Sequence, residues 1–220
     1  MAVLQKIHGS TIGKKAVVAV TGLILVGFLV GHVSGNLLFF AGAQKINDYS
    51  KFLHDSPVIL WGTRLLLLAS VAAHIIATLQ LAMLRRSARP FGYQAEKKNV
   101  SSFATRTMIL SGPLIAAFVV YHILHFTTGA AHPNFNAVDV HHNVLSAFQI
   151  WWVAAIYIGA MLILSGHLSH GIWSMLQTVG ASHPKYDGAV RRAATLVAIL
   201  IIIGFISVPL GILMGAGHGA

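Results

Sequence analysis

The chain has 220 residues, of which 56% are hydrophobic and 9% are charged, and its formal net charge is +10. Soluble domains carry about 25% charged residues, so this composition excludes a soluble protein and indicates one whose surface faces lipid. The chain has no cysteine, which excludes disulfides, iron–sulfur ligation and covalent attachment of a c-type haem.

Five segments are long and apolar enough to cross a membrane, since a transmembrane helix needs about 20 mostly apolar residues. In chain order they are Lys15–Phe40, Val58–Leu84, Phe103–Thr128, Ala147–Thr178 and Arg192–Met214. They are too long for barrel strands and do not alternate as barrel strands do. The first apolar run is longer than the core of a cleaved signal, so we expect it to be retained as a span. The sequence therefore predicts an all-α membrane protein, a single five-helix domain over residues 1–220.

The basic residues predict the orientation of this bundle. Twelve of the fifteen Lys and Arg residues fall on one side of the predicted spans: Lys6, Lys14, Lys15, Arg85, Arg86, Arg89, Lys97, Lys98, Arg106, Lys185, Arg191 and Arg192. Only Lys45, Lys51 and Arg64 fall on the other. By the positive-inside rule the N-terminus is cytoplasmic and the C-terminus lies outside, in a bacterial-type cytoplasmic membrane. Because the charge lies in short inter-span segments, it reports orientation and not a nucleic-acid partner.

The connections follow from this orientation. We expect the segments Ala41–Pro57 and Gly129–Ser146 to be outward-facing loops, and Arg85–Ser102 to be an inward-facing one. Seven of the thirteen histidines fall in loops or tails, where a solvated role is expected: His8, His54, His132, His141, His142, His183 and His218.

The other six histidines lie inside four of the spans: His32, His74, His122, His125, His167 and His170. An ionisable residue at membrane depth is costly to insert and is a candidate for function. A hydrogen bond to a neighbouring helix explains a single such histidine as well as a function does. Histidines in each of four successive spans favour a shared role.

Depth sorts four of these histidines into two layers. Counted from the cytoplasmic end at about 1.5 Å per residue, His32 and His122 lie roughly 25 and 24 Å up their spans. By the same count, His74 and His167 lie roughly 15 and 16 Å up. Depth favours His122 over His125, which stands one turn away, and it leaves the choice between His167 and its neighbour on span four open.

Two histidines at one depth on different helices can supply both axial nitrogens of a haem iron. Small residues around His32, His74 and His167 would give a porphyrin room, although they also serve close helix packing. Zinc or copper is an alternative occupant. However, no carboxylate or cysteine lies in any predicted span, and two separated pairs suit two haems better.

Four stretches carry a resemblance to a known family: GHVSGNLLFF, RLLLLASVAAH, SGPLIAAFVVYH and HLSHGIWSMLQTVG. They resemble the di-haem cytochrome b anchor of succinate:quinone oxidoreductases and quinol:fumarate reductases, in its five-helix b558 form, and the resemblance covers nearly the whole chain. It implies that His32 and His122 hold an outer haem b, and that His74 and His167 hold an inner one. On span four it favours His167 over His170.

The resemblance also implies partners and substrates. A flavoprotein subunit, where succinate and fumarate interconvert in the tricarboxylic acid cycle, and an iron–sulfur subunit would dock on the cytoplasmic basic face. The quinone is expected to be menaquinone. Because a second haem makes sense if electrons must reach the opposite side, we expect the quinone site near the outer haem. Its candidate residues are Asn47, Asp48, Tyr49, Lys51, His54 and Asp55.

Two other functions fit part of the pattern. The anchor of a hydrogenase or formate dehydrogenase also uses intramembrane histidine pairs, but the order and spacing of its motifs match less well. A transporter could use histidines as a proton relay. Transporters tend to carry intramembrane acids and broken helices, and no Asp or Glu lies in a predicted span.

Overall fold

The computed structural model describes residues 10–87, 103–181 and 183–217, without the side chains of residues 103–107. This part of the chain is helical and contains no strand. The helices are α2 (Thr11–Leu37), η1 (Leu38–Ala41), α3 (Ala43–His54), α4 (Pro57–Ser87), α5 (Phe103–Phe126), α6 (Val140–Phe148), α7 (Trp151–Thr178) and α8 (Asp187–Leu213).

Five of these helices, α2, α4, α5, α7 and α8, are long and apolar enough to cross a membrane. The predicted all-α fold with five spans is therefore confirmed. The boundaries differ most at the fifth span, where α8 begins at Asp187 and not at Arg192, and at the fourth, where Ala147 belongs to α6 and the long helix begins at Trp151.

Local sequence explains several helix ends. Ser10 caps α2, its side-chain oxygen accepting a hydrogen bond from the Gly13 N–H at 3.0 Å. Gly42 separates η1 from α3 with a φ of 98°, a conformation that favours glycine. Pro57 opens α4 at the first helical position, where the missing N–H costs nothing.

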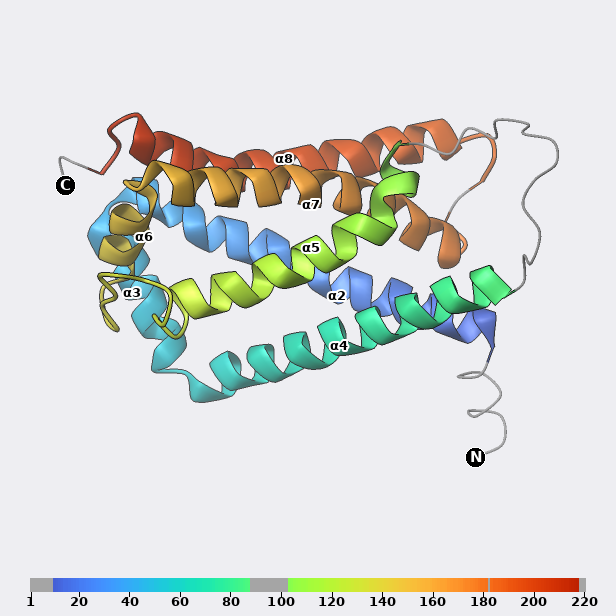
Figure 1. Ribbon diagram of the computed structural model, residues 1–220, viewed down its shortest axis with the longest axis horizontal. Helices are drawn as coiled ribbons and strands as arrows, with labels where there is room; N and C mark the ends of the chain where they lie inside the picture. The colour runs from blue at the N-terminus through green and yellow to red at the C-terminus, as the bar shows by residue number, and fades with distance from the viewer. Residues whose placement is uncertain (1–9, 88–102, 182, 218–220) are drawn as a thin grey trace.

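The two segments that we expected to be outer loops contain helices. Most of Ala41–Pro57 forms α3, and the second half of Gly129–Ser146 forms the start of α6. These helices pack on each other and, through α3, on η1. Together with residues 129–139 they form a cap over one end of the bundle, at the left of Figure 1, which we call the outer cap. Phe39, Ile46 and Phe148 are buried in its core.

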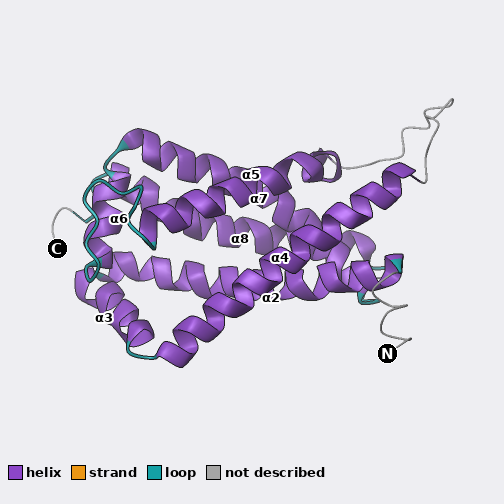
Figure 2. Cartoon of the chain, turned by 60° about the horizontal axis from the view of Figure 1, so that its bottom comes forward, coloured by secondary structure: helices purple, strands orange, loops and turns teal. Residues whose placement is uncertain are grey.

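The packing of the long helices gives their order around the bundle. Helix α2 packs on α4 and on α7, and α7 packs on α5 (Figures 1 and 2). Around the bundle, these four helices follow in the order α4, α2, α7, α5, and α8 packs against α2 and α7. Helix α2 therefore stands opposite α5, and α4 stands opposite α7.

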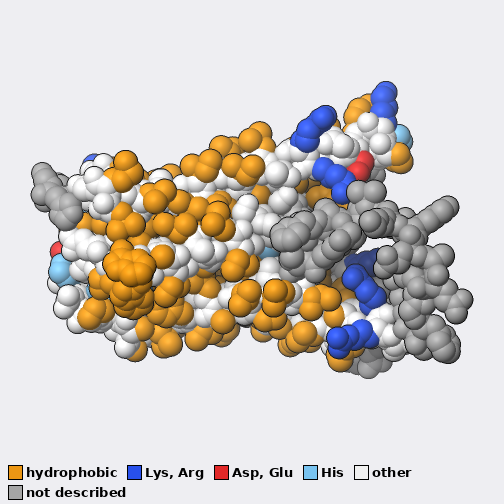
Figure 3. All heavy atoms as spheres, turned by 45° about the horizontal axis from the view of Figure 1, so that its top comes forward, with side chains coloured by type: hydrophobic (Ala, Val, Ile, Leu, Met, Phe, Trp, Pro, Cys, Tyr) orange, Lys and Arg blue, Asp and Glu red, His pale blue; other side chains and the backbone are white. Residues whose placement is uncertain are grey.

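The surface matches a membrane protein. Figure 3 shows hydrophobic side chains along the length of the bundle and Lys and Arg side chains gathered at the end away from the outer cap. The described basic residues at that end, which we call the basic end, are Lys14, Lys15, Arg85, Arg86, Lys185, Arg191 and Arg192. Lys6, Arg89, Lys97, Lys98, His8 and His218 lie outside the described residues, as does the side chain of Arg106. Which side of the membrane the basic end faces stays a prediction.

Candidate functional site

The outer pair, His32 and His122, meets in the middle of the bundle. The two ring centroids are 5.7 Å apart and the ring planes stand at 83°. His32 also stacks on Phe28 of its own helix, at 5.2 Å, and contacts Phe205 of α8 at 5.7 Å. Phe118 lies beside His122, one turn earlier on α5. The structure thus places these two imidazoles, from opposite helices, in one aromatic site.

One nitrogen of the outer pair has no hydrogen-bond partner within the protein. Among the described residues, His122 Nδ1 is the buried side-chain nitrogen or oxygen left unpartnered. A buried polar atom without a partner costs about 1–3 kcal/mol, and such an atom in a native fold calls for a physical explanation. An imidazole whose hydrogen bonding the protein does not complete fits a group that binds at this position.

The inner pair, His74 and His167, lies on the opposite helices α4 and α7. His74 Nδ1 is 3.0 Å from the hydroxyl oxygen of Thr21 on α2, and Gly22 of the same helix leaves room for its ring. His167 Nδ1 is 3.2 Å from the hydroxyl oxygen of Ser111 on α5. His74 is near enough to His167 to act on it electrostatically. Each inner histidine is therefore held from a neighbouring helix.

His125 has its own partners. It is 1% exposed, and its Nδ1 lies 2.9 Å from the Tyr157 hydroxyl of α7. Its ring also stacks on Tyr121 and on His132. A histidine so placed fills a structural role. This packing agrees with the depth argument, which favoured His122 as the ligand on this helix.

His170 lies toward the basic end and contacts Trp173 at 5.5 Å. Arg85 of α4 and Arg191 of α8 are near enough to act on it electrostatically. This places His170 among cations at the inner margin of the site, whereas His167 faces Ser111 in the bundle.

The six residues proposed for the quinone lie on α3 and at its end, and several already have partners. Both amide atoms of Asn47 are engaged: Nδ2 donates to Asp139 Oδ1 at 2.9 Å, and Oδ1 accepts from the His141 N–H at 3.0 Å. Lys51 pairs with Asp55 one turn later, and this ion pair raises the pKa of Lys51.

The remaining three candidates differ in exposure and contacts. His54 Nδ1 lies 2.8 Å from the Ser50 carbonyl oxygen. Tyr49 packs on Gly35 of α2, where a Cβ would come within 2.8 Å of its ring. Asp48 is exposed. The structure gathers these residues at the outer cap, but it gives Asn47 a structural role.

The prediction of solvated loop histidines is wrong for His132 and His141, which are 6% and 7% exposed. His132 Nε2 bonds to the Asn143 carbonyl oxygen at 2.9 Å, and His141 stacks on Phe39 at 4.7 Å. His132 is buried against His125 and Phe126 of α5, and His141 against Phe39 and Asn47 where α6 packs on η1 and α3. The Asp139 side chain, which caps α6 by accepting from the His142 N–H, is the local sequence signal that could have predicted this helix.

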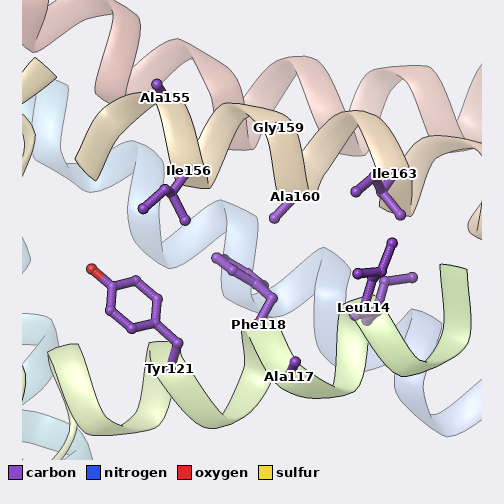
Figure 4. Close-up of a pocket in the computed structure, with 10 residues that line it drawn as sticks. Leu114, Ala117, Phe118, Tyr121, Ala155, Ile156, Gly159, Ala160 and Ile163 are labelled. Atoms are coloured by element: carbon purple, nitrogen blue, oxygen red, sulfur yellow. The ribbon is translucent and has the colours of Figure 1, made fainter. Parts of the chain in front are cut away.

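A cavity of about 410 Å³ lies between α5 and α7. Figure 4 shows Leu114, Phe118 and Tyr121 on one side and Ala160 and Ile163 on the other. On α5 these lining residues fall between Ser111 and His122, so the cavity lies at the level between the two histidine pairs. Its walls are apolar apart from one phenol, which suits a flat or elongated apolar molecule.

The described residues contain no cluster of three or more His, Cys, Asp or Glu that could hold a metal ion. Zinc sites use three or four protein ligands, so the histidines, present as pairs, do not fit the zinc alternative. A bis-histidine haem needs two. The donor sets therefore fit haem iron better than a bare metal ion.

Comparisons of the chain with protein-family models, with curated proteins and with solved structures found no match.

Proposed function

We propose that this chain is the membrane anchor and electron-transfer subunit of a succinate:quinone oxidoreductase, respiratory complex II. In this proposal it holds two b haems and passes electrons between an iron–sulfur subunit and a membrane quinone, expected to be menaquinone. Succinate oxidation would take place on a flavoprotein subunit and not on this chain.

The observation that carries the proposal is the placement of the histidine pairs. A haem iron with two imidazole ligands needs them on opposite sides of the porphyrin, hence on helices that face one another. The order α4, α2, α7, α5 sets His32 opposite His122 and His74 opposite His167. These are the pairs that depth along the spans predicts, and ring contact between His32 and His122 supports the first.

When bound, each haem would supply a one-electron carrier. The protein's own residues would set its position and surroundings. Imidazole nitrogens would hold each iron, while Phe28, Phe118 and Phe205 would exclude water around the outer pair. The apolar cavity between α5 and α7 would receive hydrocarbon edges at the level between the pairs.

The charge distribution supports the assignment of partners. Seven described Lys and Arg side chains belong to the basic end, where Figure 3 shows such side chains gathered. The inner pair is the pair nearer to this end. A hydrophilic electron donor on this end would deliver electrons first to the inner haem. A quinone at the outer cap would then receive them from the outer haem, which gives each haem a function.

A reduced-minus-oxidised spectrum of the purified chain tests the haem part of the proposal. We expect b-type bands and two haems per chain by pyridine haemochrome assay. A folded, membrane-inserted chain without b-type bands would overturn the proposal and favour the transporter alternative. Subunits that co-purify from the native membrane test the rest: a flavoprotein with an iron–sulfur protein supports complex II, whereas a hydrogenase or formate dehydrogenase subunit contradicts it.

A further inference from the structure

Two hydroxyl groups contact the inner histidines in the same way. Thr21 Oγ1 lies 2.7 Å from the Val17 carbonyl oxygen and 3.0 Å from His74 Nδ1. Ser111 Oγ lies 3.3 Å from the Met108 carbonyl oxygen and 3.2 Å from His167 Nδ1. Each hydroxyl therefore stands between a carbonyl of its own helix and an imidazole of the next helix.

Counting protons relates the tautomer of each imidazole to the direction of its hydrogen bond with the hydroxyl. A hydroxyl has one proton to donate, and a carbonyl oxygen can only accept. Where each hydroxyl donates its proton to its backbone carbonyl, its oxygen accepts from the imidazole, and Nδ1 of His74 and of His167 then carries the proton. The Val18 carbonyl oxygen of α2 also lies close to the His74 ring. In a neutral imidazole, Nε2 then keeps its lone pair.

The two hydroxyls also share a position in the sequence. Thr21 precedes His32 on α2 by eleven residues, and Ser111 precedes His122 on α5 by the same eleven. Eleven residues are about three turns of α-helix, so both members of each pair lie on one face. One face of α2 and one face of α5 therefore each carry a histidine at the depth of the outer pair and a hydroxyl at the depth of the inner pair.

The surroundings of the outer pair differ from those of the inner pair. His122 Nδ1 is buried without a hydrogen-bond partner in the described part of the protein, and His32 is surrounded by aromatic rings. The hydroxyl contacts are therefore a property of the inner pair and not of every histidine in the bundle.

We propose that Thr21 and Ser111 are positioning residues for the inner haem, holding His74 and His167 in the tautomer that offers Nε2 to the iron. This inference rests on the proposed function. A hydrogen bond from the distal ring N–H orients a ligating histidine and raises its basicity. A more basic ligand favours the oxidised iron, so loss of either hydroxyl raises the midpoint potential of the inner haem.

The test is a potentiometric titration of both haems in the wild-type complex and in Thr21→Val and Ser111→Ala, each close in size to the residue it replaces. Both variants should raise the potential of the same haem, the one absent from His74→Ala, and leave the other unchanged. Ser111→Ala should also release that haem more readily, by roughly 10- to 100-fold in affinity. Thr21→Val should have the smaller effect, because the Val18 carbonyl remains beside His74.

The chain offers matched controls. Thr78 donates to the His74 carbonyl oxygen at 2.8 Å and Ser34 to the Val30 carbonyl oxygen at 2.8 Å. Both are hydroxyls bonded to their own helix, and among the described residues neither forms a hydrogen bond with an imidazole. Thr78→Val and Ser34→Ala should leave both potentials unchanged. Thr21→Ser and Ser111→Thr keep the hydroxyl and should titrate as the wild type does, which separates the hydrogen bond from a general loss of packing.

Three results would overturn the inference while leaving the proposed function intact. They are two haems with unchanged potentials in Thr21→Val and Ser111→Ala, shifts in different haems, and equal shifts in the controls. A wild-type complex without b haems would instead overturn the proposed function.

Discussion

The imidazole rings of His32 and His122 stand edge to face at 5.7 Å, although within the described residues α2 and α5 make no extensive contact with each other. Helix α7 packs on both of these helices. The contact is therefore made by long side chains that reach into the centre of the bundle from opposite walls. In the proposed function the two histidines would hold one group between their helices, and they would then act as a unit.

The first prediction follows from this pairing. His32→Ala and His122→Ala should each lose the outer haem, and the double variant should lose no more than either single one. His74→Ala and His167→Ala should behave in the same way toward the inner haem, because a bis-histidine iron needs both nitrogens. The ratio of haem to protein, measured with the redox spectrum of the haem that remains, is the readout.

A double variant that replaces one histidine of each pair is the control for that pairing. His32→Ala combined with His74→Ala should remove both haems. His125→Ala and His170→Ala should keep two, since His125 already bonds to Tyr157 and His170 lies beside Trp173 at the inner margin. If the double variant kept one haem, or if His170→Ala lost the inner haem while His167→Ala kept both, the ligand assignment would be wrong.

The second prediction concerns the stability of the outer cap in acid. The His142 N–H and the Asn47 amide hold the pKa of Asp139 below its usual range. Because the folded pKa is the lower one, the carboxylate contributes stability above the unfolded-chain pKa of about 3.9, and the contribution is lost as pH falls through the folded pKa. At pH 7, Asp139→Ala should cost about 0.5–2 kcal/mol, as for other helix N-caps.

Thermal unfolding of wild type and Asp139→Ala, compared at pH 7 and in acid, measures this contribution. The gap between the two proteins should be full at pH 7 and should shrink below pH 4 or so as Asp139 takes up a proton. Asp48→Ala is the control, because Asp48 is an exposed residue of α3 outside the capping contacts. A gap that does not change with pH would show that the charge of Asp139 is not responsible.

The features of this structure that could be predicted from the sequence are those that depend on a single helix. Hydropathy alone locates the five spans, and a fixed rise per residue sorts His32, His74, His122 and His167 into two levels. Partners across helices depend on how each helix is rotated about its axis, which hydropathy does not specify. The contact of Ser111 with His167 was for this reason not predictable.

The helices of the outer cap were not predicted, for a different reason. Helix α3 is amphipathic and polar overall, and Ile46 is its buried residue. In a chain where long apolar runs mark the helices, such a segment is typical of a loop. Burial of His141 depends on contacts between segments about 90 residues or more apart, such as its own contacts with Asn47 and Phe39. Local patterns contain no information on those contacts.

The third prediction tests how closely α8 must approach α2. A Cβ added at Gly204 would lie 2.5 Å from Val33 Cγ2, and Val33 is buried beside His32. Gly204→Ala should therefore force the helices apart and lower stability by about 1–3 kcal/mol. The adjacent Phe205 contacts His32, so the spectrum and potential of the outer haem should change while those of the inner haem do not.

Two variants control for this steric explanation. Val33→Ala combined with Gly204→Ala makes room for the new methyl group and should recover part of the lost stability. Gly112→Ala, where nothing lies within 4 Å of the added Cβ, should unfold as the wild type does or at a slightly higher temperature. Equal losses at Gly112 and Gly204 would mean that glycine is needed in these helices for some reason other than close packing.

The fourth prediction tests the orientation, and the absence of cysteine from the chain makes the experiment clean. Lys185 lies at the basic end and Lys45 on α3 of the outer cap, and both are exposed. If the basic end is cytoplasmic, as the positive-inside rule predicts, a membrane-impermeant maleimide should label Lys45→Cys in intact cells and Lys185→Cys only after the membrane is opened. The two substitutions remove the same charge, so they differ only in position.

The hydrophilic subunits, if they dock at the basic end, should also protect Lys185→Cys in the assembled complex. Labelling of Lys185→Cys in intact cells would show that the orientation is the reverse of the predicted one, and the assignment of inner and outer haems would then be reversed as well.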